Sequence, residues 1–476
     1  MPDFVTPAKG LTEPTVGADN NTWGGILNTD FSLIDSALGG TVSISISGTT
    51  TSITSTQAQN TGYVFTGSLT ALNTITWPAG FYGPVFITNS TSGNQLIQAG
   101  MNGGGYATIL PNEAALLWSD GTNFNRISVL GPAPNILTNP FVEIDQANEG
   151  SSVSLSSGTA AYVVDGWQAA FHSSTAVVTA QRVADGPLTY PNSIKLTVST
   201  GASVAAGDYL YVRAPIEANN IAETAFGNAA ARTVAVTFWA KSSIGSYVMS
   251  GAIQNFAQTR SYPFNVTISS SATWTKCTVI VPGDVAGTWV TSGTGGGMYL
   301  VLTAAAGSTY QGTASTWAGS NYLGTSSNTN TILSTSSATF QISVAKLEVS
   351  PIPTPYGRIN FEDEYARCQR FYEKNYNLGT AVATATSVGD TFLLGATGAG
   401  TAGSTVYFRT TKRATPSITV YSSVTGTSGK VADLVNSTDV TLTTSGPGMD
   451  GFGWFASPSA GSTAEFSFQW TADARL

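Results

Sequence analysis

The sequence predicts an all-β, multidomain protein of antiparallel β-sandwich or jelly-roll domains, with a short N-terminal helix and one helix leading into a C-terminal β-domain. Three observations predict this fold class. The chain has 476 residues, enough for about three or four domains. Charged residues make up only 10% of it, against roughly 25% in ordinary soluble domains. Short alternating segments recur between turns rich in Gly, Pro and Asn.

The composition also limits the partners. Ser, Thr, Asn and Gly replace the missing charged residues and favour turns and short strands over helices. Low charge weakens repulsion between copies, which suits a chain that lies against copies of itself. A net charge of −8 without any basic run gives no surface for nucleic acid. The start, MPDFVTPAKG, lacks an apolar signal region, and no long apolar run follows, so we expect no membrane insertion.

The first helix is expected within residues 1–40. Apolar residues recur there at helical spacing: Trp23, Leu27, Phe31, Ile34 and Leu38. Asn20 or Asn21 is the expected cap, and Gly39 with Gly40 the stop. So short a helix, with two internal glycines, cannot bury its apolar stripe alone. Two interpretations stay open: the helix caps the next domain, or it docks onto a neighbouring subunit or a larger assembly.

The next two domains are predicted from strand-like segments. Residues 41–131 read as a small β-domain, and the two prolines of GPAPN mark a linker near its end. Residues 132–357 form the largest unit, a sandwich or jelly roll of many short strands. Within it, 303–339 is expected to be a long surface loop. No period of ~20–50 residues recurs, which argues against a long solenoid.

A linking helix is predicted over 358–376, followed by a C-terminal β-sandwich over 377–476. The helix places Phe361, Tyr365, Cys368 and Tyr372 on one stripe, with acidic residues in the first turn and basic residues later. This stripe is interpreted as structural, either as core or as the seam of three helices.

Several stretches resemble modules of tail fibres and minor tail proteins of tailed bacteriophages. WGGILNTDFSLID at 23–35 resembles their N-terminal segment, and residues 87–124 resemble a β-module of phage structural proteins. NPFVEIDQ, followed by VVDGW, resembles the start of a fibre jelly roll, with matching positions Asn139, Pro140, Asp145, Gln146, Asp165 and Trp167. CQRFY at 368–372 and FQWTADARL at the end complete the resemblance, although Arg475 stands where these fibres have an acidic residue.

The resemblance implies a homotrimeric fibre in the virion, located in the tail or on the baseplate or capsid. Its N-terminus would attach to other virion proteins, with Trp23, Leu27, Phe31 and Ile34 as the docking residues. Its β-domains would bind host surface polysaccharide or lipopolysaccharide, because such jelly rolls are similar to carbohydrate-binding modules. Two alternatives stay open, namely a capsid or baseplate decoration protein without receptor role, and a polysaccharide depolymerase.

The reactive residues give little support for catalysis. His172 is the one histidine, and we expect a structural role for it. Cys277 and Cys368 fit no metal spacing and are expected to be buried free thiols. No cofactor is expected; calcium is the metal that the oxygen ligands of Asp145, Asp165 or Glu348 could bind. Paired carboxylates could hydrolyse a glycan, but no catalytic motif surrounds the acids.

Glycan binding requires exposed aromatic rings that stack on sugars, with polar groups for the hydroxyls. The aromatic residues considered are Trp289, Tyr299, Tyr310, Trp317, Tyr322, Phe452, Trp454 and Phe455. Trp317, Tyr322 and Trp454 lie among turn-forming residues and are the preferred candidates.

Overall fold

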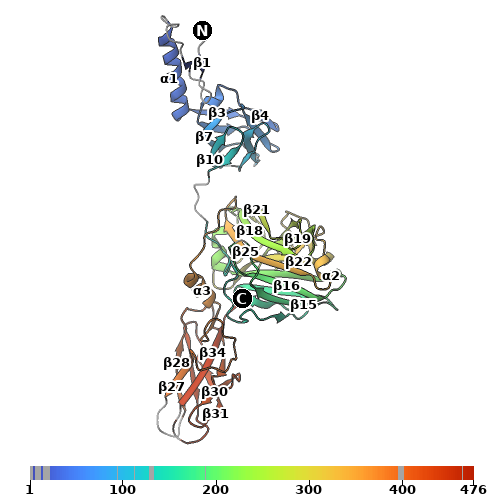
Figure 1. Ribbon diagram of the computed structural model, residues 1–476, viewed down its shortest axis with the longest axis vertical. Coiled ribbons are helices and arrows are strands. Elements are labelled where there is room, and N and C mark those ends of the chain that lie inside the picture. The colour runs from blue at the N-terminus through green and yellow to red at the C-terminus, as the bar shows by residue number, and fades with distance from the viewer. Residues whose placement is uncertain are drawn as a thin grey trace. The chain divides into compact units, whose positions relative to one another are not determined.

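The computed structural model describes residues 4–5, 12–13, 22–93, 95–111, 113–127, 133–187, 189–394, 401–461, 463 and 465–476. The chain divides into two compact units, Met1–Gly131 and Pro132–Leu476 (Figure 1). The division falls in the GPAPN segment. Both units are built mainly of strands, and most of the sheets are antiparallel, so the predicted all-β fold class is confirmed. No helix among the described residues is long and apolar enough to cross a membrane.

The first unit contains helix α1 (Trp23–Gly39), a five-stranded sheet of order β11-β10-β7-β5-β3 and a four-stranded sheet of order β4-β6-β8-β9. Aromatic and aliphatic side chains between the two sheets form its core, including Tyr63, Phe65 and Trp77. The bounds are β1 Phe4–Val5, β2 Thr12–Glu13, β3 Thr41–Ser45, β4 Thr50–Ser52, η1 Gln57–Gln59, β5 Gly62–Thr66, β6 Asn73–Trp77, β7 Tyr82–Asn89, β8 Ile97–Met101, β9 Ala107–Ile109, β10 Ala114–Asp120 and β11 Phe124–Arg126.

Several neighbouring strands of this unit are parallel. Strand β4 pairs with β6 and β6 with β8, so that Thr50 lies beside Thr74 and Asn73 beside Ile97, a step of 24 residues each time. Strands β3, β5 and β7 also pair in parallel. The chain therefore winds alternately through the two sheets in stacked turns. Sequence periodicity misses this short coil, because the step repeats in the backbone path and not in residue identity.

The second unit begins with a jelly-roll-like sandwich of two six-stranded antiparallel sheets, whose strands run from green to orange in Figure 1. Their orders are β12-β15-β16-β25-β18-β21 and β13-β14-β17-β22-β19-β20. One continuous core joins the inner faces. The bounds are β12 Val153–Ser154, β13 Ala161–Val164, β14 Trp167–His172, β15 Val177–Val183, β16 Ser193–Thr200, β17 Tyr209–Glu217, η2 Ala218–Thr224, β18 Val234–Ser242, β19 Tyr247–Asn255, β20 Ser261–Ile268, β21 Thr275–Val281, β22 Gly296–Ala306, η3 Ser308–Tyr310, β23 Gln311–Gly312, β24 Gly324–Thr325, α2 Thr331–Ser334 and β25 Thr339–Val349.

A smaller β-sandwich follows in the same unit. Strand β34 is its centre and pairs with β26, β27, β29 and β30, while β33 lies between β28 and β32 in a second sheet. Phe452, Phe468 and Trp470 belong to the core between the sheets. The bounds are α3 Phe361–Gln369, β26 Tyr372–Lys374, β27 Thr391–Leu394, β28 Ala402–Tyr407, β29 Ser417–Ser422, β30 Lys430–Asp433, β31 Thr438–Thr441, β32 Thr443–Ser445, β33 Gly451–Ala456 and β34 Glu465–Asp473.

The linking helix differs from the prediction. Helix α3 ends at Gln369, and Tyr372 is a residue of strand β26. Cys368 and Tyr372 are 1% and 6% exposed, so both are packed inside a single chain. A seam between copies through these two residues is therefore wrong, since their side chains cannot reach a partner. Phe361 is 43% exposed and stacks on Tyr365 at 6.0 Å between ring centres, and a role of these two between copies stays a prediction.

Ion pairs fasten the jelly roll to the smaller sandwich. Arg370 donates to both carboxylate oxygens of Glu217, at 2.9 and 2.7 Å. Lys374, which is fully buried, pairs with Glu149 of the jelly roll. Glu217 and Glu149 are themselves nearly inaccessible to solvent. Removing one partner of such a pair leaves an uncompensated buried charge, so these contacts hold the two sandwiches in a fixed relation.

Candidate functional site

The stretch predicted as a loop at 303–339 is only partly one, since residues 303–306 belong to strand β22 and Ile332 and Leu333 pack in the main core. The part around Tyr322 and Leu323 is bound to the face of the β19–β20–β22 sheet that points away from that core. Gln254 of β19 donates from its side-chain amide to the carbonyl of Tyr322, at 2.9 Å. The Ser261 hydroxyl of β20 accepts from the Tyr322 N–H at 3.2 Å. Thr303 donates to the carbonyl of Leu323 at 2.6 Å, and Leu323 is buried. These contacts fix the segment on a rigid sheet.

A hollow of about 580 Å³ opens on this segment. Its size lies within the range of small-molecule sites, roughly 300–1,000 Å³. The lining contains hydroxyl groups, one amide and one aromatic ring: Ser308, Gln311, Gly312, Thr313, Ala314, Thr316, Ala318, Tyr322, Thr325, Ser326 and Ser327. We call it the loop pocket.

Tyr322 is the aromatic ring of the loop pocket. It is half-buried, and the parallel pairing of β23 with β24 brings Gly312 against it. A Cβ on Gly312 would lie 2.3 Å from the ring atom Cδ2, so the position accepts no larger residue without moving the ring. Of the three preferred aromatic candidates, Tyr322 lines the loop pocket.

Trp317 is packed by its neighbours. It is half-buried against the main core, and its ring lies 5.6 Å from Phe226 and 5.2 Å from Tyr262, measured between ring centres. Its indole N–H donates to the carbonyl of Pro282 at 2.9 Å. Arg260 lies beside the same ring. Trp317 therefore supports the segment that carries the loop pocket and presents little free ring for a ligand.

The prediction that Trp454 contacts a glycan is wrong. It belongs to strand β33, is 3% exposed and packs edge-on against Phe468 in the core of the smaller sandwich. The neighbouring residues Gly451 and Gly453, which suggested a turn, belong to strand β33 itself. Phe452 is buried in the same core, whereas Phe455 on the opposite face of β33 is 43% exposed.

Three further aromatic residues of the considered set are occupied by protein partners. Tyr299 is buried, with the guanidinium of Arg213 at 4.2 Å from its ring centre. Tyr310 packs edge-on against Tyr209. Trp289 donates its indole N–H to Asp284 at 3.0 Å. These rings stabilise the sandwich through aromatic and cation–π contacts.

Sequence reasoning misses the hydroxyl groups of the loop pocket. Ser308, Thr313 and Ser326 carry no aromatic or charged signal, and such residues are abundant throughout the chain. Among the described residues, their side-chain hydroxyls have no hydrogen-bond partner. The signal that could have drawn attention to them is the absence of any charged residue and of histidine from 285 to 345.

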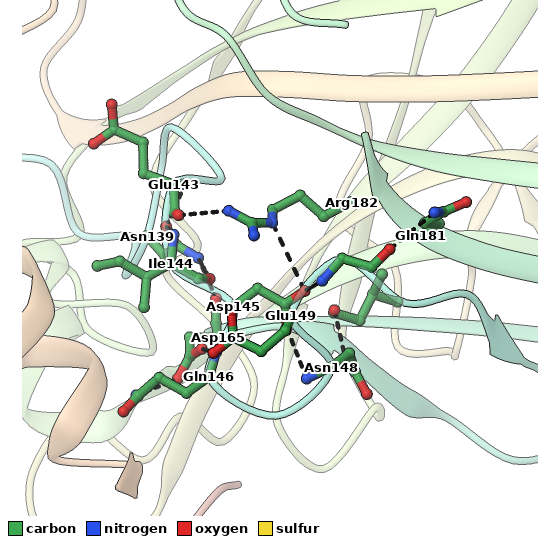
Figure 2. A network of polar contacts seen from close by, with 12 residues as sticks. Asn139, Glu143, Ile144, Asp145, Gln146, Asn148, Glu149, Asp165, Gln181 and Arg182 are labelled. Carbon is green, nitrogen blue, oxygen red and sulfur yellow. Dashed lines mark hydrogen bonds and ion pairs between the residues drawn. The ribbon is translucent and has the colours of Figure 1, made fainter. Parts of the chain in front are cut away.

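The motif NPFVEIDQ builds a structural network (Figure 2). The side-chain amide of Asn139 donates to the carbonyls of Ile144 and Asp165, at 2.7 and 2.9 Å. Its side-chain oxygen accepts the N–H groups of Glu143 and Ile144. Trp167 donates its indole N–H to the carbonyl of Asn139 at 3.1 Å. The matching positions of the motif thus fix the entry of the chain into the jelly roll.

The carboxylates predicted as possible calcium ligands already accept hydrogen bonds from other groups of the protein. The carboxylate of Asp145 accepts hydrogen bonds from the backbone N–H groups of Asn148 and Gly150. Burial raises the pKa of this carboxyl, although the two hydrogen bonds lower it. Asp165 accepts both the backbone N–H and the side-chain amide of Gln146, at 2.7 and 2.8 Å. Burial raises the pKa of Asp165 to about 6.

Glu348, the third of these acids, is buried and pairs with Lys346 at 2.8 Å. Among the described residues no cluster of three or more His, Cys, Asp or Glu side chains is arranged to hold a metal ion. The acids named for calcium instead bind backbone amides and a lysine.

The remaining reactive residues are placed as follows. His172 is half-exposed at the end of β14, and its Nδ1 lies 3.2 Å from Asp208. Cys277 and Cys368 are buried and free, as predicted, and burial raises the pKa of both thiols. Arg475, which departs from the fibre pattern, pairs with Asp473. None of these side chains lines the loop pocket.

The apolar stripe of α1 is exposed. Trp23 is 61% and Phe31 58% exposed, Leu27 and Ile34 are also exposed, and the helix has no buried residue. The helix ends at Gly39 as predicted, and its cap is Thr22; Asn20 and Asn21 lie outside the described residues. The hydroxyl of Thr61, which precedes strand β5, donates a hydrogen bond to the carbonyl of Ala37 and so joins the last turn of α1 to the β-strands of the same unit.

Comparisons with known proteins give structural similarity alone. No family model and no curated protein sequence matches the chain. Similar solved structures include a family 11 carbohydrate-binding module of a Clostridium thermocellum cellulase, at 12% identity over 41% of this chain and 97% of that chain, with a TM-score of 0.22. A xylan-binding domain from Paenibacillus barcinonensis is 10% identical over 47% and 99%, with a TM-score of 0.23.

A third similar structure is the enzymatically active domain of tailspike protein 4 of bacteriophage CBA120. It is 11% identical, and the match covers 64% of this chain but only 38% of that one, with a TM-score of 0.26. At these identities and TM-scores the similarities assign neither a family nor a ligand to the chain.

Proposed function

We propose that this chain is a structural fibre protein of a tailed-bacteriophage virion that binds a host surface polysaccharide or lipopolysaccharide through its β-domains. The observation that carries the binding role is the loop pocket, where free hydroxyls and the Tyr322 ring stand together on a fixed support. The phage assignment depends on the ordered sequence resemblances.

The chemistry of the loop pocket suits a saccharide. A sugar ring presents hydroxyls at its edge and C–H groups on its faces, so it requires hydrogen-bonding groups beside an aromatic surface. Ser308, Thr313 and Ser326 offer hydroxyls that both donate and accept. Because Gln254 and Ser261 hold the backbone of Tyr322, little ordering is needed when a ligand binds.

The exposed stripe of α1 is the proposed attachment surface. The two internal glycines of the helix, Gly24 and Gly25, lower its intrinsic stability, and large exposed apolar side chains in a row favour a partner. In this proposal Trp23, Leu27, Phe31 and Ile34 insert into a groove of another virion protein. The fibre is proposed to be a homotrimer, so that three weak glycan sites act together.

The proposal is tested with purified full-length chain and polysaccharide extracted from host cells. Tyr322→Ala should weaken binding about tenfold, since one aromatic stacking contact contributes about 1–1.5 kcal/mol. Tyr407→Ala is the matched control, because Tyr407 is 77% exposed and lies outside the loop pocket. Equal affinity of wild type and Tyr322→Ala, or no binding by wild type, contradicts the binding role.

The proposal includes no catalytic activity. Incubation of the trimer with the same polysaccharide should release no new reducing ends. Their release would show a depolymerase instead. A decoration protein without receptor role would leave phage adsorption unchanged when Tyr322→Ala is introduced into the virion, whereas we expect adsorption to fall.

A further inference from the structure

The loop pocket has no charged lining residue. The segment from 285 to 345 contains no Asp, Glu, Lys, Arg or His, although one residue in ten of the whole chain is charged. All of the lining residues belong to this segment. Arg260, which lies beside Trp317 behind the segment, is already paired with Asp284 through two hydrogen bonds of 2.7 and 2.6 Å. Among the described residues, the lining of the pocket therefore offers a ligand no free cation.

A charged ligand would bind such a pocket poorly. A carboxylate or phosphate that loses part of its hydration in this hollow must recover that energy from cations or several strong donors, and the lining residues include no cation. A net charge of −8 on the chain adds weak repulsion toward anions. A neutral hydroxyl, by contrast, exchanges hydrogen bonds with water for similar bonds with the protein.

The free hydroxyls of the pocket match neutral sugars in a second respect. Ser308, Thr313 and Ser326 each offer a group that donates or accepts according to its partner, as sugar hydroxyls also do. Gln311, the one amide of the lining, donates from Nε2 to the carbonyl of Ala306 at 2.7 Å. These residues do not form the fixed array of strong hydrogen-bond donors that an anion requires.

We propose that the loop pocket selects uncharged saccharides, built of hexose or N-acetylhexosamine units with free hydroxyls, and rejects units that bear carboxylate or phosphate. This inference rests on the proposed glycan-binding function and narrows it to one chemical class.

The experiment begins with full-length chain on an array of neutral and acidic bacterial surface polysaccharides. The strongest neutral binder is then selectively oxidised, so that its C6 hydroxymethyl groups become carboxylates while the backbone stays the same. We expect the oxidised form to bind at least tenfold more weakly than its parent in a calorimetric titration. A comparable or higher affinity for the oxidised form overturns the selectivity.

A charge-inserting variant makes the test specific to the pocket. Thr313 is exposed and lines the pocket, so Thr313→Lys adds a cation there without disturbing a hydrogen bond. It should raise the affinity for the oxidised polysaccharide about tenfold. Thr313→Ser is the matched control and should bind as wild type does. An unchanged thermal midpoint verifies that both variants fold.

The outcomes separate the two proposals. If wild type prefers acidic polysaccharides and Tyr322→Ala weakens that binding, the selectivity is wrong and the glycan-binding function stands. If no polysaccharide binds, or if Tyr322→Ala binds as wild type does, the pocket is not a glycan site and both proposals fail.

Discussion

Asp165 should make the second unit less stable as the pH rises from about 4 to about 6. Its carboxyl group is buried, and burial raises its pKa from 3.8 to about 6 although Gln146 donates two hydrogen bonds to it. Asp145 raises this pKa further, and Arg475 lowers it. Since the pKa in the folded state exceeds that in the unfolded state, the folded chain binds more protons in this window.

The magnitude follows from the shift. About two pKa units at ~1.36 kcal/mol each give a loss of about 3 kcal/mol, which is complete above about pH 6. The replacement Asp165→Asn removes the titrating group. The replacement also removes a carboxylate oxygen that accepts a hydrogen bond from Gln146. That change lowers the stability of the variant by the same amount at every pH.

The assay is urea unfolding of wild type and Asp165→Asn from about pH 4 to about pH 7, followed by tryptophan fluorescence. The difference in unfolding free energy, wild type minus variant, should fall by about 2.5 kcal/mol across this range, because part of the loss has already occurred at pH 4. Taking the difference cancels the groups that titrate independently of Asp165 in the same window. A difference that is independent of pH, or that rises with pH, would refute the reasoning.

Three further outcomes are expected. Trp454→Ala should lower the unfolding free energy by about 3–5 kcal/mol, because it empties the core of the smaller sandwich, and calorimetry should show this loss with glycan affinity retained. Gly312→Ala should weaken glycan binding with little change in thermal midpoint, because its Cβ displaces the Tyr322 ring; unchanged binding would contradict this. The double replacement Trp23→Ala and Phe31→Ala should change stability by less than about 0.5 kcal/mol but leave virions without the protein, as an immunoblot of purified particles would reveal.

The sequence predicts much of the fold and less of the site. The strands, the linker and the helix α1 can be predicted because each leaves a local pattern in the sequence: alternation for a strand, prolines for the linker and an apolar stripe for the helix. The prediction of Trp454 as a glycan contact is wrong because its glycine neighbours suggest a turn. They lie instead in strand β33, whose alternate residues face the core. The end of α3 was missed because Tyr372 fits helical spacing but pairs with the distant strand β34. Pairing between remote segments leaves no local pattern.

The loop pocket shows the same limit. Tyr322 could be chosen from sequence because it stands among turn-forming residues. Its partner Gly312 could not, since their contact arises from the parallel pairing of two short strands. Hydroxyl residues become a site only when the sheet beneath them fixes their positions.

The stacked turns of the first unit bear on how a unit of this kind can vary in length. Each turn of about 24 residues bonds mainly to the turns before and after it. Adding or removing one whole turn would preserve every remaining strand pair and leave both ends of the unit chemically unchanged. Duplication of a short gene segment would then lengthen this unit in discrete increments, without changing a residue of the second unit.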